Sequence, residues 1–302
     1  MLTDAELKTA REILGELGEP VEIISINSDE FVRQICNLSE KITCSFLRRD
    51  GVPTVVIRRG DVEITYHAIP TGNEFEPFLK TVKMLSNVRC FENLSADIKV
   101  FIAPSCPHCA RVVENVNRIA VKNPRVKVKI IDVSLLPDTI EKYGIKSAPT
   151  VIINDEIRLV GYVDEEEIRR LIKDKDKREY IRILLINGSV DDVKDLAYRD
   201  RNCLKTLAEY IAHREFPVRL GSMIVLDQIF KERPDLIKPL KCEIRKHLKS
   251  NDSRIKQDTA MLLGYIGDEE DIRFLEELLK ENGDVRESAI EAIDLIRRRS
   301  KS

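Results

Sequence analysis

Residues 98–121 read IKVFIAPSCPHCARVVENVNRIAV and predict a strand followed by a helix. The apolar run 98–103 predicts a short strand, and residues 107–121 have the apolar spacing of a helix. Cys106 and Cys109 lie where the strand and the helix meet. Backbone N–H groups and the dipole at a helix N-terminus favour the thiolate of Cys106, and Cys109 follows about one turn later, close enough to form a disulfide with it. The spacing therefore predicts a reactive dithiol.

The two residues between the cysteines fit this interpretation. Pro107 suits the first helical turn because it has no N–H to satisfy. His108 offers a positive charge beside the thiolate, which would make the disulfide more oxidising. A Cys-x-x-Cys pair is also half of many zinc sites, but the sequence has no second Cys or His pair of matching spacing. We therefore expect redox chemistry and no metal, with His108 tuning the potential rather than binding an ion.

Within residues 98–172, the predicted strands and helices alternate in the order βαβαββα. Such alternation implies parallel pairing of the first two strands, and the closing hairpin adds an antiparallel pair. Asp164 is predicted to cap the last helix. The predicted strands are 98–103, 126–133, 150–153 and 157–160, and the predicted helices are 107–121, 136–143 and 164–172.

The first segment of the chain repeats this order after one additional helix. Val52-Pro53-Thr54 precedes its hairpin, as Ala148-Pro149-Thr150 precedes the other one. The chain is therefore predicted to be internally duplicated. The predicted helices are 3–17, 29–41 and 73–85, and the predicted strands are 21–26, 43–47, 54–57 and 62–66.

Only helices are predicted after residue 175. The pairs Val218-Arg219, Ile255-Lys256 and Val285-Arg286 each open a helix. Positions 4, 8 and 11 after the first residue of each pair form one stripe on a helix. The stripe residues are Ser222, Thr259 and Ala289, then Leu226, Leu263 and Ile293, then Ile229, Ile266 and Ile296. With further helices at 236–248 and 271–279, this segment resembles HEAT-like repeats, which stack as a two-helix solenoid.

The first 174 residues resemble two fused thioredoxin-like folds. They are similar to the N-terminal domain of the flavoprotein subunit of alkyl hydroperoxide reductase and to the tandem-fold protein disulfide oxidoreductases of archaea. The first fold lacks a dithiol, as in the flavoprotein family. The resemblance rests on the segments Pro20–Ile23, Pro70–Phe75, Cys106–Cys109, Asn123–Val126 and Ala148–Thr150.

This resemblance implies roles for two further residues. Pro149 corresponds to the cis-proline that faces the dithiol in a thioredoxin fold and leaves backbone free to pair with a substrate. Glu74 matches the glutamate of the flavoprotein family's Gly-x-Glu-Phe motif, which assists proton transfer at the dithiol; a simple capping role for Glu74 stays open. The sequence has no flavin or nicotinamide fingerprint, so we expect no cofactor and an electron donor or acceptor that is a separate protein.

The remaining composition limits the class of protein. Charged residues make up 34% of 302, but the formal net charge is only −2, which argues against a nucleic-acid binder. No apolar run suggests a membrane span or a signal peptide, so we expect a cytoplasmic protein. Cys36 and Cys44 are interpreted as core thiols, Cys203 and Cys242 as packing residues, and Cys90 has no assigned role. Pro53 is interpreted as a retained structural feature, with a peptide-binding groove as the alternative.

The expected architecture is therefore α/β tandem thioredoxin-like folds followed by an all-α HEAT-like solenoid. The predicted domains are a fold without a dithiol (1–90), a fold with the dithiol (91–174) and the helical repeats (175–302). We expect a thiol–disulfide oxidoreductase that acts on a protein disulfide, with the repeats as a docking domain. The alternative is an interaction module of repeats in which the dithiol serves as a redox sensor.

Overall fold

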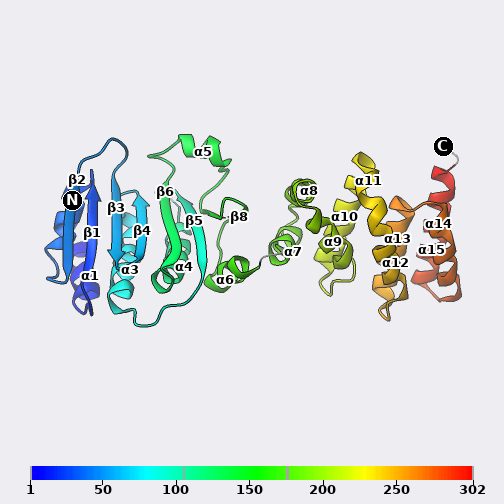
Figure 1. Ribbon diagram of the computed structural model, residues 1–302, viewed down its shortest axis with the longest axis horizontal. Coiled ribbons are helices and arrows are strands. Elements are labelled where there is room, and N and C mark those ends of the chain that lie inside the picture. Colours follow the sequence, from blue (N-terminus) through cyan, green and yellow to red (C-terminus); the bar gives the residue numbers. More distant parts are fainter. Residues whose placement is uncertain (1, 105, 175–176, 301–302) are drawn as a thin grey trace. The chain divides into compact units, whose positions relative to one another are not determined.

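The computed structural model describes residues 2–104, 106–174 and 177–300 (Figure 1). The chain divides into two compact units, Met1–Lys173 and Asp174–Ser302. The first unit is α/β and the second is helical, as predicted from the change of pattern near residue 175.

The first unit is built on one eight-stranded sheet with the order β2-β1-β3-β4-β6-β5-β7-β8. Each half of this sheet has the same internal pairing. The first strand of each half (β1, β5) lies between a parallel partner (β2, β6) and an antiparallel partner (β3, β7), and a hairpin strand (β4, β8) follows. The strands are β1 (Val21–Ile26), β2 (Ile42–Leu47), β3 (Thr54–Arg59), β4 (Val62–His67), β5 (Ser95–Ile102), β6 (Arg125–Asp132), β7 (Thr150–Ile153) and β8 (Ile157–Val160).

Parallel pairing of β4 with β6 joins the two halves. The partners run from Ile64 opposite Val128 to His67 opposite Ile131. Strands from both predicted folds are therefore hydrogen-bonded into one continuous sheet.

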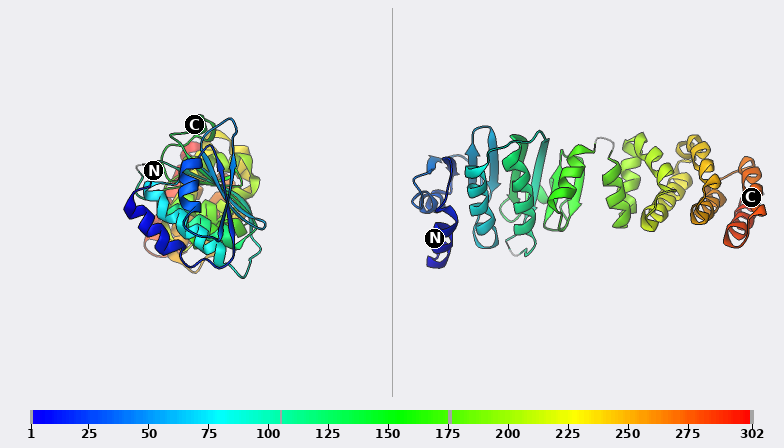
Figure 2. Two further views of the ribbon diagram at one scale, coloured as in Figure 1. Left: turned by 90° about the vertical axis from the view of Figure 1, so that its left-hand side faces the viewer. Right: turned by 90° about the horizontal axis from the view of Figure 1, so that it is seen from below.

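Helices α1, α3, α4 and α6 pack against one another in this order. Figure 2 (left) shows α1 and α3 in blue and cyan on one side of the strands. Thr3 and Glu6 form a capping box at the start of α1, and the Asp164 carboxylate accepts from the backbone N–H of Glu167 at the start of α6, at 2.8 Å, as predicted for Asp164. The helices are α1 (Asp4–Leu14), α2 (Asp29–Cys36), α3 (Phe75–Asn87), α4 (Cys109–Lys122), α5 (Asp138–Tyr143) and α6 (Glu165–Lys173), and the 3-10 turn η1 (Gly72–Glu74) precedes α3.

The helix boundaries in this unit differ from the predictions by up to five residues, and two of the differences concern cysteines. Helix α2 ends at Cys36 rather than Lys41, because the N–H of Asn37 closes the last turn and the chain then turns into β2. Helix α4 begins at Cys109 rather than Pro107, so Cys106 lies in a turn three residues before the helix.

The helical unit buries the predicted stripe. All nine stripe residues are at most 5% exposed. The opening residues Val218 and Val285 are buried as well, whereas Ile255 is half-buried. The α-helices are α7 (Arg178–Ile186), α8 (Val190–Arg199), α9 (Arg201–Tyr210), α10 (Phe216–Glu232), α11 (Pro234–Ile237), α12 (Lys241–Lys246), α13 (Ser253–Ile266), α14 (Glu269–Glu277) and α15 (Asp284–Arg299).

The helix predicted over 236–248 is broken into short pieces. Helix α11 ends at Ile237, the 3-10 turn η2 (Lys238–Leu240) follows, and α12 then continues to the 3-10 turn η3 (His247–Lys249). Pro239 lies within η2 and has no N–H to donate to the preceding turn, which explains the break.

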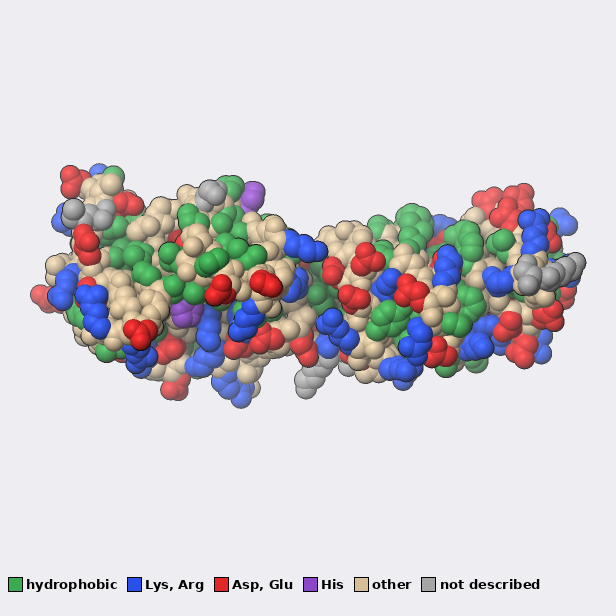
Figure 3. All heavy atoms as spheres, turned by 90° about the horizontal axis from the view of Figure 1, so that it is seen from above, with side chains coloured by type: hydrophobic (Ala, Val, Ile, Leu, Met, Phe, Trp, Pro, Cys, Tyr) green, Lys and Arg blue, Asp and Glu red, His purple; other side chains and the backbone are tan. Residues whose placement is uncertain are grey.

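Charged residues of both signs are interspersed over the face drawn in Figure 3, so this face has no basic stripe. Among the described residues, no helix is both long and apolar enough to span a membrane.

Candidate functional site

Cys106 and Cys109 lie in the turn between β5 and α4 and are joined by a disulfide, with their Cα atoms 5.5 Å apart. The strand positions the turn because β5 is hydrogen-bonded on both sides, to β6 and β7. Cys109 is the first residue of α4 and is fully buried, whereas Cys106 is 9% exposed. Attack from outside therefore reaches the sulfur of Cys106 before that of Cys109.

The segment before β7 faces this sulfur. The Ala148–Pro149 peptide bond is cis, and the Sγ of Cys106 lies 3.5 Å from the carbonyl oxygen of Ala148. Pro149 is buried, and its carbonyl oxygen accepts from the N–H of Gly161, the residue directly after β8. The structure thus brings Cys106, Cys109 and Pro149 together.

His108 and Pro107 are exposed on the outer side of the same turn. His108 occupies the residue before α4 without a side-chain capping hydrogen bond. Its imidazole is therefore available to solvent or to a docked partner beside the disulfide.

Glu74 ends the turn η1, which packs against α4, the helix that begins at Cys109. Its side chain is only 8% exposed, and its Oε2 atom has no hydrogen-bond partner within the described chain. Burial, with a smaller contribution from the charge of Asp132, raises the pKa of Glu74 to about 7. A carboxyl with this pKa both holds and releases a proton near neutral pH.

A buried polar cluster lies beside Glu74 and was not predicted from the sequence. The Asn117 side-chain amide of α4 donates to the Tyr66 hydroxyl at 2.7 Å and to Thr81 at 2.9 Å. Burial and the nearby charge of Glu74 raise the pKa of Tyr66. This cluster links β4 and α3 to α4. The only sequence signal for it is a polar Asn within the apolar face of a helix.

The equivalent turn of the first half contains no cysteine. Asn27 adopts a positive φ of 57°, which Asn tolerates, and Ser28 precedes α2. The buried Ser28 hydroxyl donates to the carbonyl oxygen of Thr54 at 2.9 Å. Among the described peptide bonds, that before Pro53 is not cis, so Pro53 does not reproduce the geometry at Pro149.

The interpretation of Cys36 and Cys44 as core thiols is wrong. They form a second disulfide, with their Cα atoms 6.2 Å apart, and both residues are half-buried. The expectation failed because the helix over 29–41 was predicted too long; ending it at Cys36 brings this residue opposite β2. Sequence reasoning therefore missed this pair.

The other cysteines are free. Cys203 is buried, as expected for a packing residue, and burial raises its pKa to about 12. Cys242 is exposed, so its interpretation as a packing residue is wrong, and Cys90 is exposed as well. The described residues include no cluster of three or more His, Cys, Asp or Glu side chains able to hold a metal ion.

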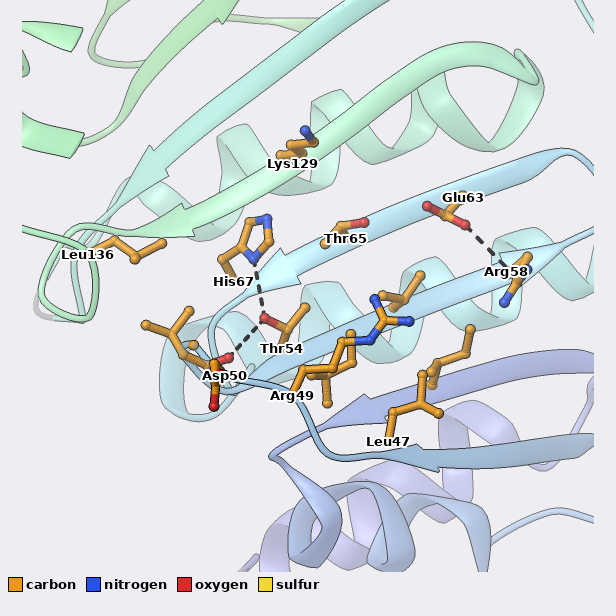
Figure 4. Close-up of a pocket in the computed structure, with 15 residues that line it drawn as sticks. Leu47, Arg49, Asp50, Thr54, Arg58, Glu63, Thr65, His67, Lys129 and Leu136 are labelled. Carbon is orange, nitrogen blue, oxygen red and sulfur yellow. Dashed lines mark hydrogen bonds and ion pairs between the residues drawn. The ribbon is translucent and has the colours of Figure 1, made fainter. Parts of the chain in front are cut away.

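A cavity of about 650 Å³ lies on the sheet, lined mostly by the first half together with Lys129 of β6 and Leu136 of the second half. Figure 4 shows His67, Thr65 and Glu63 on β4 beside Thr54 and Arg58 on β3. The Nδ1 atom of His67 lies 3.2 Å from the Thr54 hydroxyl. Burial, and then the charge of Lys129, lowers the pKa of His67. The cavity contains neither a cysteine nor Glu74 and so is separate from the redox site.

Comparisons with known proteins agree with the dithiol site. Residues 96–173 match the thioredoxin domain family. The thioredoxin of Methanocaldococcus jannaschii is 34% identical over 77 residues, which cover 25% of this chain and 91% of that protein. The alkyl hydroperoxide reductase AhpF of Pseudomonas aeruginosa is 26% identical over 241 residues, 68% of this chain. The match spans only 46% of that relative's own length.

Solved structures share the fold of the first unit. The N-terminal domain of the alkyl hydroperoxide reductase AhpF from Enterococcus faecalis has a TM-score of 0.52 at 21% identity, covering 57% of this chain and all of that one. A protein disulfide oxidoreductase from Aeropyrum pernix has a TM-score of 0.50 at 22% identity, covering 57% of this chain and 93% of that one. The first unit is therefore a thioredoxin-like α/β region, followed by a largely helical part.

Proposed function

Because this chain belongs to the thioredoxin family through residues 96–173, we propose that it is a thiol–disulfide oxidoreductase that acts on protein disulfides. The observation that carries the proposal is the Cys106–Cys109 pair, placed at the start of α4 and opposite the carbonyl of Ala148. Relatives that carry out redox chemistry support it at the level of the reaction class.

The reduced pair would transfer two electrons in two exchange steps. The Cys106 thiolate attacks one sulfur of a substrate disulfide, forming a mixed disulfide and releasing a substrate thiolate, which takes up a proton. The Cys109 thiol then loses its proton and attacks Cys106 Sγ, which breaks the mixed disulfide and releases the second substrate thiol. The substrate disulfide becomes two thiols, and the Cys106–Cys109 disulfide forms. A separate dithiol protein must then return the two electrons.

Three neighbouring residues would assist these steps. Pro149 and the backbone of Ala148 position the substrate chain beside Cys106. Glu74 accepts the proton that Cys109 loses, because its raised pKa of about 7 suits proton exchange near neutral pH. The exposed His108, in the same turn as Cys106, tunes the stability of the Cys106 thiolate.

We further propose that the first unit consists of two thioredoxin-like folds, 1–90 without a dithiol and 91–174 with one. The repeated strand order within the single sheet supports this division. No flavin or nicotinamide site is proposed.

Residues 175–302 would form HEAT-like repeats that dock the protein substrate or the electron-donor protein. The buried stripe on α10, α13 and α15 supports repeated packing. The Arg219 guanidinium of α10 donates to Asp258 of α13 at 2.7 Å, and Lys256 of α13 donates to Glu281 at 2.5 Å, so neighbouring repeats share similar ion pairs. Solenoids of this kind present extended binding surfaces.

An insulin-reduction assay with dithiothreitol as the electron donor tests the reaction. We expect the wild-type chain to accelerate insulin reduction and the Cys106→Ser chain to fall to the rate of dithiothreitol alone. Cys90→Ser is the matched control, because Cys90 is an exposed free cysteine, and it should retain the wild-type rate. Equal rates for wild type and Cys106→Ser would refute the proposal.

The alternative function is an interaction module in which the dithiol senses redox state. This alternative is supported by Asp174–Ser302, which form a compact unit of their own, as an interaction module requires. A partner that is held without a covalent bond in both redox states, with no insulin turnover, would favour the module over the enzyme.

A further inference from the structure

The second disulfide lies at the sheet edge furthest from β8. Cys36 is the last residue of α2, and Cys44 lies in the middle of β2, the terminal strand of the sheet. Both side chains are half-buried, so a thiol reagent can approach the bond from outside. No step proposed for Cys106 and Cys109 uses this pair.

The fold holds the two sulfurs near each other without the disulfide. Phe31, Val32 and Ile35 anchor α2 in the core, with at most 6% exposure. In the connection, the N–H of Leu38 donates to the carbonyl oxygen of Ile35 at 3.1 Å, and the N–H of Ile42 donates to that of Ser39 at 3.1 Å. Breaking the sulfur bridge therefore leaves α2 and β2 in place, and the two thiols stay positioned to form the bond again.

The pair is too far from the first disulfide for direct exchange within one chain. Strands β2 and β5 are separated by five strand spacings of about 4.8 Å, or roughly 24 Å, whereas thiol–disulfide exchange requires contact between sulfurs. Any electrons that reach Cys36 and Cys44 must come from another molecule.

We propose that Cys36 and Cys44 form a second, reversible thiol–disulfide site that exchanges with external dithiols. One thiolate of the dithiol attacks a sulfur of the pair, the Cys36–Cys44 bond breaks, and the released thiolate takes up a proton. The second thiol of the reagent then loses its proton, attacks the mixed disulfide and releases the other cysteine. The reagent becomes a disulfide, and the pair gains two electrons and two protons. A disulfide compound reverses the reaction by the same steps.

The test uses the full chain carrying Cys106→Ser and Cys109→Ser, so its outcome does not depend on the proposed function. The protein is equilibrated with mixtures of reduced and oxidised dithiothreitol and, for the more oxidising end of the series, of reduced and oxidised glutathione. It is then denatured in a maleimide and weighed by mass spectrometry. Three free cysteines plus the two of the pair give five sites. We expect three labels under oxidising conditions, five under reducing conditions, and a single reversible two-electron transition between them.

Adding Cys36→Ser to this chain provides the matched control, which should carry four labels in every mixture because Cys44 has lost its partner. Five labels in the parent chain throughout the series would show that the bond does not form. Three labels throughout would show that dithiols do not reach it. Either result overturns the proposal.

Discussion

The two halves of the eight-stranded sheet share a strand order but differ at the turn that follows their first strand. After β5, Cys106 lies 3.5 Å from the carbonyl of Ala148. After β1, the Ser28 hydroxyl bonds the carbonyl of Thr54 at 2.9 Å. In both halves, a side chain of the turn reaches the segment that leads into the hairpin. The reactive turn differs from the structural one in this side chain and also in the backbone that it faces, because the peptide bond before Pro149 is cis and the bond before Pro53 is not.

The two disulfides extend this comparison. Cys109 begins α4, with Cys106 before it, whereas Cys36 ends α2. A helix N-terminus stabilises an anion and a C-terminus does not, so the two pairs differ in how readily they supply a thiolate. Proximity of two cysteines is therefore not sufficient for efficient exchange. The end of the helix at which the pair lies matters as much as the distance between the cysteines.

The largest expected effect is a difference in the rate of insulin reduction between variants of the two cysteine pairs. Cys109→Ser should lower the rate of insulin reduction by at least about 100-fold, because no thiol remains to resolve the mixed disulfide. The same chain should accumulate a covalent adduct at Cys106, detected by non-reducing electrophoresis. Cys44→Ser should keep the rate within about twofold of wild type. An equal loss in both variants would remove the distinction between the pairs.

The next effect concerns stability. Cys36→Ser opens the small loop closed by the second disulfide, and we expect a loss of about 2–3 kcal/mol in the free energy of unfolding of the oxidised protein. Urea denaturation under oxidising conditions measures this loss. In the presence of dithiothreitol, the wild-type and variant curves should coincide. A difference that persists under reducing conditions would instead assign the loss to packing.

Glu74 provides a comparison across pH. Its pKa is raised from the ordinary value of 4.5 to about 7, so between these values the folded state holds more protons than the unfolded state. Stability attributable to Glu74 therefore falls as pH rises through this window, and below it the contribution vanishes. Glu74→Gln should exceed wild type in stability by about 2 kcal/mol at pH 8 and equal it at pH 4.

Urea denaturation at each pH measures this effect. Glu76→Gln, on the exposed side of α3, is the control and should not change the pH trend. A pH trend unchanged in Glu74→Gln would contradict the assignment to Glu74.

The smallest expected effect lies at the structural turn. Ser28→Ala leaves the carbonyl of Thr54 without its hydroxyl donor and should reduce the free energy of unfolding by about 1 kcal/mol. Insulin reduction should remain unchanged, since the dithiol lies in the other half. The exposed Ser95→Ala is the control and should change stability less. A loss of turnover in Ser28→Ala would show that the two turns are coupled.

Much of the fold could be predicted because the spacing of apolar residues indicates which face of a helix or strand is buried. The strands Val21–Ile26, Thr150–Ile153 and Ile157–Val160 have the predicted boundaries. Helix ends were less accurate, since the end of α2 depends on a turn hydrogen bond at Asn37 that the apolar pattern does not encode. The joining of β4 to β6 was not predicted, because edge pairing between two duplicated segments depends on tertiary contacts.

The site was predictable where its residues are adjacent in sequence. Cys106 and Cys109 follow from spacing alone. Glu74 was identified only through a family resemblance, and its burial was not predicted because an isolated acid before a helix is usually exposed. Asn117 and Tyr66 meet across 51 positions of chain, so no local pattern relates them. The Cys36–Cys44 disulfide was missed because α2 was predicted to be longer than it is.

The pairing of β4 with β6 has a consequence for dissecting the protein. Cutting the chain near residue 90 would remove β4, one of the two strands that pair with β6. The backbone groups of β6 that face Ile64–His67 would then be exposed to water. An uncovered strand of this kind recruits other strands, so a fragment holding only the dithiol half would be prone to self-association. The half without the dithiol thus acts as a permanent cover for the half that has it.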